Sequence, residues 1–209
     1  NNIIKEIKNE HFLNTEIVYI DDPFIIDFHN FRKDGETNSF LSRTSGNTTN
    51  HRRSLLSHYM NNKALTLIDK ANLKDKLTLV YKKINNILGS DMALFETNND
   101  GMSRGTRTKG LSLDSLSSGM KTFYLIKSLI DNGTIVQNGT LILDEPEVHL
   151  HPDWQVTLAE VIVLLQREMG LHILINTHSP YFLRAIEVFS GKYDTEDVVK
   201  YYLSYNEGD

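Results

Sequence analysis

The 209-residue sequence contains no cysteine, so neither a disulfide nor a thiolate metal site can form within it. Long apolar runs are also absent, because no stretch approaches the roughly 18 residues that a membrane-spanning helix needs. The N-terminal segment "NNIIKEIKNEHF" lacks the basic and then apolar layout of a secretory signal. We therefore expect a protein of the cytoplasm with no membrane partner.

An excess of positive charge is lacking as well. The chain has 22 Lys and Arg against 27 Asp and Glu, a net charge of −5, so its bulk composition gives no sign of nucleic-acid binding. Five basic residues lie in or near polar segments: Arg52, Arg53, Arg104, Arg107 and Lys109. Solvated surface charge is the ordinary interpretation of such residues, and contact with DNA is the alternative.

Apolar residues make up 40 % of the chain, which is enough for a full core in one domain or in a domain with an insertion. Short apolar and β-branched runs predict strands at residues 15–20, 140–145, 171–176 and 197–204. The second and third of these strands are expected to be buried on both faces, as parallel strands are. Residues 24–29 predict a further strand or a packed loop.

Apolar residues at spacings of three and four predict helices at residues 51–88, 117–133 and 151–170. The first of these is expected to break into two helices near residues 72–75. The last has an apolar stripe made of Trp154, Leu158, Val161, Ile162, Leu165 and Met169. Polar segments at residues 34–50 and 97–110 predict loops.

A strand, a helix and a strand with short links form a right-handed parallel unit. The predicted fold class is therefore α/β, a parallel sheet with a helical insertion. Residues 1–30 are expected to form a sheet segment of the core, residues 31–110 a loop and helical insertion, and residues 111–209 the remainder of the core.

The segment "LILDEPEVHLHPDWQ" at residues 141–155 places two acids at the end of an aliphatic strand. Ligands of α/β sheets bind beyond the carboxyl ends of the strands. Asp144 is the kind of residue that holds Mg²⁺ near phosphates in nucleotide hydrolases. Glu145 points elsewhere because side chains alternate along a strand, so it is available for another atom, such as the oxygen of an attacking water.

Two further motifs accompany these acids. "LSSGM" at residues 116–120 opens a predicted helix, where hydroxyls, a glycine and free N–H groups form an anion site or, in the plainer interpretation, a helix cap. "INTHSP" at residues 175–180 ends the next strand and places His178 on the same rim as the acids.

Together, "LSSGM", "LILDEPEVHLHPDWQ" and "INTHSP" resemble the ATP-binding-cassette class of P-loop ATPases. The similarity is closest to its soluble, non-transporter branch, which includes the overcoming-lysogenization-defect (OLD) type, AAA-like ATPases of bacterial defence systems, and recombination and chromosome-maintenance ATPases. It is strong over residues 111–190. It implies an ATPase that dimerises around ATP and Mg²⁺ and drives or gates an effector protein, with DNA or phage defence as the setting.

The resemblance also implies roles for single residues. Ser117, Ser118 and Gly119 would contact the γ-phosphate of ATP held by the partner subunit of a homodimer. Asp144 would hold Mg²⁺, Glu145 would polarise the attacking water, and His178 would sense the γ-phosphate. The segment from Glu147 to Asp153 would lie at the dimer interface.

No G-x-x-x-x-G-K-[ST] phosphate loop occurs in the sequence; "GTRTKGLS" at 105–112 has the wrong spacing and "GNTTNHRRS" at 46–54 has no lysine. In the resembled family that loop precedes everything found here. We therefore expect a chain that begins after it and that is inactive by itself.

Two other interpretations remain open. One is a degenerate ATPase lobe that serves as a non-enzymatic dimerisation or regulatory module. The other is a metal-dependent hydrolase that uses His149 and His151 with Glu147 and Asp153, since H-x-H can chelate Zn²⁺.

Overall fold

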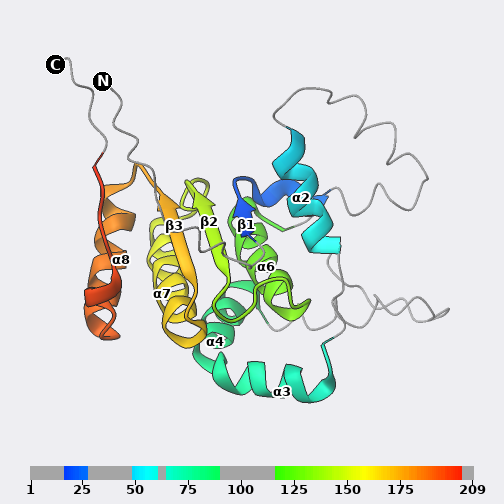
Figure 1. Ribbon diagram of the computed structural model, residues 1–209. Helices are drawn as coiled ribbons and strands as arrows, with labels where there is room; N and C mark the ends of the chain where they lie inside the picture. Colours follow the sequence, from blue (N-terminus) through cyan, green and yellow to red (C-terminus); the bar gives the residue numbers. More distant parts are fainter. Residues whose placement is uncertain (1–16, 28–48, 61–64, 90–115, 204–209) are drawn as a thin grey trace, which may run out of the picture.

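The computed structural model describes residues 17–27, 49–60, 65–89 and 116–203. Within these residues, β1 (Ile17–Ile20), β2 (Thr140–Asp144) and β3 (His172–Asn176) form one sheet in the order β1-β2-β3 (Figure 1). Both pairings are parallel. The fold is thus α/β with a parallel sheet, as the sequence predicts, and the carboxyl ends of all three strands lie at one edge.

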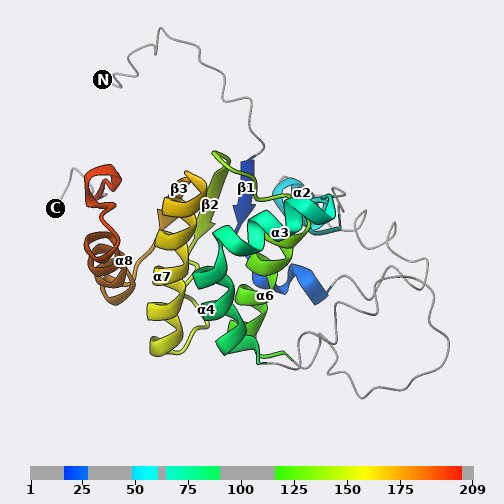
Figure 2. The ribbon, with the colours of Figure 1, turned by 90° about the horizontal axis from the view of Figure 1, so that it is seen from below.

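Three helices lie against one face of this sheet (Figure 2): α4 (Thr78–Leu88), α6 (Ser118–Asp131) and α7 (Pro152–Met169). Alternate side chains of β1 and β2 point into this layer and are buried, namely Val18, Ile20, Leu141 and Leu143. The predicted apolar stripe of α7 is buried in the same core, with Trp154 partly buried at its start. The inserted α4 is therefore part of the core layer, while the predicted division of the chain at residues 30 and 110 stays a prediction.

Among the described residues, the opposite face of the sheet is exposed at β1 and β3 and half-buried at β2, which corrects the expectation that β3 is buried on both sides. Ile17 on β1 is 52 % exposed and Leu174 on β3 is 61 % exposed. β3 is also the edge strand of the described sheet, so its side chains have a described neighbour strand on one side only. The apolar composition of β3 predicts a strand with both faces buried. Composition does not show which segments pack against each face.

The ends of the helices follow their sequence signals. Ser117 caps α6, and its Oγ accepts a hydrogen bond of 3.4 Å from the backbone N–H of Met120. α7 has His151 as its N-cap and Pro152 at its first position, where the missing N–H is not needed. It ends at Gly170, whose φ of +63° is the left-handed conformation that favours glycine. These signals confirm the predicted limits of both helices.

Three helices, rather than two, come from the region predicted as helical between β1 and β2: α2 (Thr49–Met60), α3 (Leu67–Lys76) and α4. The predicted break at residues 72–75 is wrong, because these residues lie inside α3 and the chain turns at Leu77. α3 begins at a capping box in which Thr66 and Asp69 exchange hydrogen bonds. The T-x-x-D pattern that marks this box is present in the sequence and locates the missed start.

One predicted strand is not a strand, and the segment predicted as either a strand or a packed loop is a loop where the structure describes it. Residues 23–27 form a 3₁₀ turn in which Ile25 and Ile26 are buried, so this segment is the packed loop of the two alternatives. After helix α8 (Pro180–Lys192), Glu196–Val198 form a 3₁₀ helix and residues 199–203 have no regular structure. A strand needs a neighbouring strand that accepts its backbone hydrogen bonds. The segment after α8 (Figure 1) pairs with none of the described strands, so it has no such neighbour.

One buried charge joins three of the helices. Glu160 on α7 is 4 % exposed, and its carboxylate contacts Lys83 Nζ on α4 at 2.5 Å and Lys192 Nζ on α8 at 2.9 Å. The hydroxyl of Tyr193 donates to the same carboxylate at 2.6 Å. Burial by itself raises the pKa of Glu160, but the hydrogen bonds from Lys83, Tyr193 and Lys192 outweigh it and lower this pKa to about 2.

We predict that Glu160→Gln destabilises the fold at neutral pH, because both lysines lose their counter-charge. The lysines are partly exposed, so the loss is about 2 kcal/mol, less than for a fully buried pair. The folded pKa of Glu160 lies below the ordinary value of 4.5, so its stabilising effect is complete above pH 4.5 and is lost as the pH falls towards about 2. Urea unfolding at pH 7 and at pH 3 measures this.

Glu168→Gln on the same helix is the matched control, because Glu168 makes only a partly exposed contact of 3.7 Å with Arg167. Equal effects of the two substitutions at pH 7 would contradict a special role for Glu160.

Candidate functional site

Asp144 ends β2 and is held by both neighbouring strands. The hydroxyl of Tyr19 on β1 donates to its Oδ2 at 2.9 Å, and the amide of Asn176 on β3 donates to its Oδ1 at 2.7 Å. The hydrogen bond to Asp144, and to a smaller degree burial, raises the pKa of Tyr19. The Tyr19 hydroxyl and the Asn176 amide thus hold the Asp144 side chain in place from both sides.

The donor chemistry of Asp144 fits Mg²⁺. Each of its oxygens accepts one hydrogen bond from the protein, which leaves lone pairs on a hard oxygen ligand that faces the rim of the sheet. Mg²⁺ is commonly held by one or two carboxylates together with waters and substrate phosphates, so a single well-oriented Asp is a sufficient protein ligand.

Glu145 and His178 come together at this edge. His178 Nε2 lies 3.3 Å from Glu145 Oε1, with the histidine side chain 82 % exposed and the glutamate side chain 45 % exposed. The backbone of Glu145 has a φ of +45°, uncommon for a residue with a side chain, and its N–H donates to the carbonyl of Asn176 at 2.8 Å. This turn directs the Glu145 carboxylate towards the loop that carries His178.

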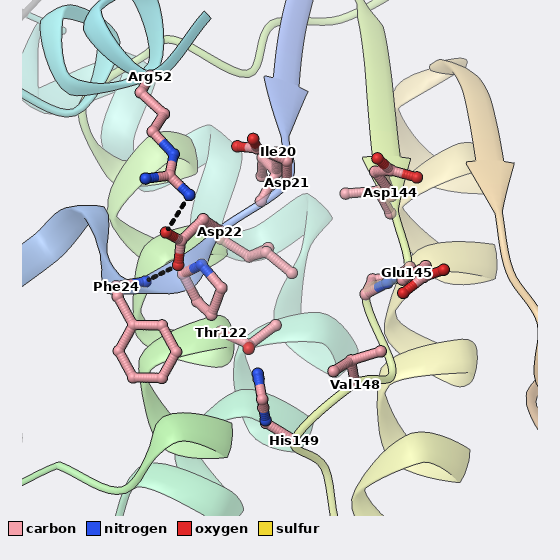
Figure 3. A pocket seen from close by; sticks show the side chains of 14 residues that line it. Ile20, Asp21, Asp22, Phe24, Arg52, Thr122, Asp144, Glu145, Val148 and His149 are labelled. Atoms are coloured by element: carbon pink, nitrogen blue, oxygen red, sulfur yellow. Dashed lines mark hydrogen bonds and ion pairs between the residues drawn. The ribbon is translucent and has the colours of Figure 1, made fainter. Parts of the chain in front are cut away.

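A cavity of about 310 Å³ opens beside these residues (Figure 3). Asp144 at the end of β2 and Glu145 directly after it line one side, and Asp21 and Asp22, which follow β1, line the other side. Arg52 reaches in from α2 and pairs with Asp22 at 3.1 Å. The cavity thus combines carboxylates from two strand ends with one guanidinium.

The acids at residues 21 and 22, together with Arg52, were not among the expected site residues. Their signal was available, because "DDP" directly follows the strand at residues 15–20 and parallel strands end at the same edge. Arg52 carried no comparable signal, since only tertiary packing places α2 next to β1.

The segment from Ser117 to Gly119 does not line this cavity. Ser117 is exposed at the start of α6, and Gly119 is buried against the start of α7. A Cβ at Gly119 would lie 2.8 Å from the Trp154 ring and 3.0 Å from Leu150, so the glycine permits close packing of the two helix starts. Gly119 therefore lies next to the start of α7, and none of the three residues lines the cavity of Asp144 and Glu145.

The residues of the proposed H-x-H metal site have other contacts. The ring of His149 packs edge-on against Phe24 with centroids 5.8 Å apart, and His151 Nδ1 accepts from the Asp153 N–H at 3.3 Å as the cap of α7. The Glu147 carboxylate is buried against Thr177. Among the described residues, no group of three or more His, Cys, Asp or Glu side chains is arranged to hold a metal ion.

The remaining basic residues give no described patch. Arg52 is used in the ion pair with Asp22, and Arg53 lies next to it on α2. Arg104, Arg107 and Lys109 lie outside the residues that the structure describes. Nor does any helix in the described ranges combine the length and apolar character required to cross a bilayer.

Comparison with known proteins identifies related sequences. Residues 6–184 match the family described as "AAA domain, putative AbiEii toxin, Type IV TA system". The Septu protein PtuA of Bacillus thuringiensis is 36 % identical over 86 residues, which cover 35 % of this chain and 21 % of that protein. The retron Vc95 probable ATPase of Vibrio cholerae serotype O1 biovar El Tor is 29 % identical over 86 residues, covering 36 % of this chain and 16 % of that protein. No solved structure matches significantly.

The chain therefore covers less than a quarter of the length of either relative. The family match, in contrast, extends from before β1 into α8 and so includes every strand of the sheet and both segments that carry Asp144, Glu145 and His178. On this match, the chain belongs to the AAA ATPase family described as "AAA domain, putative AbiEii toxin, Type IV TA system".

Proposed function

We propose that this chain is the hydrolytic part of an ATPase, in which Asp144, Glu145 and His178 act on the γ-phosphate of Mg-ATP. The observation that carries the proposal is the 3.3 Å contact between Glu145 and His178, beside Asp144, at the carboxyl edge of a parallel sheet. Ligands of α/β sheets bind at this edge. The family match and a relative named as a probable ATPase support the same function.

Each residue has a role that its position supports. Asp144 would hold Mg²⁺, which neutralises charge that develops on the phosphates. Glu145 is half exposed and would orient the attacking water and accept its proton, and His178 would donate a hydrogen bond to the γ-phosphate. Tyr19 and Asn176 keep Asp144 in position through their hydrogen bonds.

A phosphate loop has to come from outside this sequence, because none of its segments has the required pattern. Such a loop supplies most of the N–H groups and the lysine that hold the β- and γ-phosphates. Ile17 and Leu174 give the exposed sheet face an apolar surface. The segment that carries the phosphate loop would pack against this surface. With that loop, the ATPase would be of the ATP-binding-cassette type, of the OLD-like branch.

The signature segment would act in a homodimer. Ser117, Ser118 and Gly119 lie at a helix start and do not line the cavity of Asp144 and Glu145 in the same chain, so we assign them to the nucleotide of a second subunit. Closing and opening of this dimer would drive an effector protein. We propose bacterial defence as the setting, since the three motifs resemble those of AAA-like ATPases of bacterial defence systems, with DNA as a candidate partner.

We predict that the 209-residue chain alone binds Mg-ATP weakly, with a dissociation constant above about 1 mM, and does not hydrolyse it. The reason is the absent phosphate loop. Isothermal titration calorimetry with Mg-ATP is the measurement, and micromolar binding would show that the described residues hold the phosphates by themselves.

In the full-length protein, we predict that Glu145→Gln lowers turnover by at least about 10²-fold and leaves ATP binding intact, because the amide keeps the shape but cannot accept the proton. Steady-state phosphate release and nucleotide binding measure the two effects. Glu187→Gln is the control, because Glu187 is an acid on α8 whose side chain is 55 % exposed and lies outside the cavity. Wild-type turnover in Glu145→Gln would exclude Glu145 as the base.

The dimer predicts rescue between two inactive variants. His178→Ala removes a donor from the subunit's own nucleotide, and Ser118→Arg blocks the nucleotide of the partner. Ser118 is preferred to Ser117 because Ser117 caps α6, and loss of the cap costs about 1 kcal/mol. Each homodimer should be inactive, whereas the mixed dimer carries both lesions in one site and keeps the other site intact.

Mixing the two variants should therefore restore phosphate release, up to one working site per mixed dimer. Analytical ultracentrifugation with ATP checks that mixed dimers form. Mixed dimers that bind ATP and remain inactive would argue that Ser118 and His178 serve the same nucleotide, or that the two sites must fire together.

A further inference from the structure

A second, partly buried pair lies next to the Glu145–His178 pair in the sequence: Glu147 is two residues after Glu145, and Thr177 is one residue before His178. Glu147 is 5 % exposed, and its Oε1 accepts a hydrogen bond from the hydroxyl of Thr177. Glu147 follows Glu145 in the same turn, and Thr177 precedes His178 in the same loop. The hydrogen bond between Thr177 and Glu147 therefore joins the turn that carries Glu145 to the loop that carries His178.

The Thr177 hydroxyl is used in both directions. It donates to Glu147 and accepts from the backbone N–H of Ser179 at 3.0 Å. Ser179 in turn caps α8, with its Oγ accepting from the N–H of Phe182 at 3.2 Å. The residues on both sides of His178 are thus held by hydrogen bonds. The His178 side chain itself is 82 % exposed and has little packing to hold it.

Burial of the Glu147 carboxylate lowers the stability of the fold if packing is its only role. Its second carboxylate oxygen, Oε2, is buried and has no hydrogen-bond partner among the described residues. An apolar side chain of similar volume would fill this space without the cost of burying an unpaired polar atom. A fold selected only for stability would not place a carboxylate here.

We propose that Glu147 is a positioning residue, which acts through Thr177 to hold the His178 loop against the Glu145 turn. The proposal rests on the ATPase function proposed above. The reacting groups must keep a fixed separation, and a displacement of about 1 Å costs on the order of 10²-fold in rate. The hydrogen bond between Thr177 and Glu147 links the turn to the loop more rigidly than the exposed contact between Glu145 and His178 does.

Two pairs of variants separate this role from packing. Glu147→Met and Thr177→Val keep volume and remove the hydrogen bond, whereas Glu147→Gln and Thr177→Ser keep an acceptor and a hydroxyl, respectively. In the full-length protein, we expect the first two to lower kcat at least about 10-fold with KM for ATP within about 3-fold, and the second two to retain kcat within about 3-fold.

The melting temperature of Glu147→Met distinguishes the positioning role from a purely structural role, because a purely structural role predicts a lower melting temperature for this variant. Glu147→Met should melt at the same temperature as the wild type or higher, because it removes a buried unpaired oxygen, and yet it should lose turnover. Loss of turnover together with a large drop in melting temperature in Glu147→Met would overturn the proposal, as would wild-type kcat in Glu147→Met and Thr177→Val.

Hydrogen exchange of the 209-residue chain tests the link without ATP hydrolysis. In Thr177→Val, the Ser179 N–H loses its acceptor, so exchange in the peptide 176–183 should be about 3- to 10-fold faster, with Thr177→Ser and the interior of α7 unchanged. Unchanged exchange in Thr177→Val would overturn the proposal. If the wild-type full-length protein has no ATPase activity, the proposed function fails, and the exchange result alone decides whether this pair holds the loop.

Discussion

The parallel pairing of β2 with β3 places Asp144 opposite Asn176 and brings the segments that follow these two residues to one edge of the sheet. In this register the Asn176 amide reaches the Asp144 carboxylate, the Glu145 N–H reaches the Asn176 carbonyl, and Glu145 approaches His178. A shift of one residue would turn every side chain of β3 to the other face and would separate all of these contacts. The site is therefore a consequence of strand register.

The helix layer holds that register. Val18, Leu141 and Leu143 are buried against helices on one face of the sheet, so a slip would expose apolar surface. Glu160 adds a polar link in the same layer, because its carboxylate ties α7 to α4 and to the end of α8. α8 begins directly after the loop of His178, so its anchored far end also limits how that loop can move.

Charge is arranged in two levels at the edge of the sheet. The first level is exposed and chemically available and consists of Glu145 and His178. The second level is the buried Glu147, whose Oε1 accepts a hydrogen bond from Thr177 and whose Oε2 has no partner among the described residues. Such a division suits a phosphate-handling site, because groups that meet water and nucleotide need freedom of solvation, whereas the backbone that carries them must not move.

The sequence by itself determined the α/β class, the parallel sheet, the limits of α6 and α7, and the position of Asp144, Glu145 and His178 at strand ends. These features depend on local signals: apolar periodicity, a serine cap, a terminal glycine, and acids that close an aliphatic run. The sequence did not determine that the segment at residues 197–204 is not a strand or that one face of β3 is exposed, because both depend on which neighbours are present.

Only the tertiary structure decided that Arg52 pairs with Asp22, that Gly119 makes room for Trp154, and that Glu147 accepts a hydrogen bond from Thr177. Each of these contacts joins residues that are about 30 positions or more apart in the chain. Their separation is set by strand register and helix packing, and no local pattern records it.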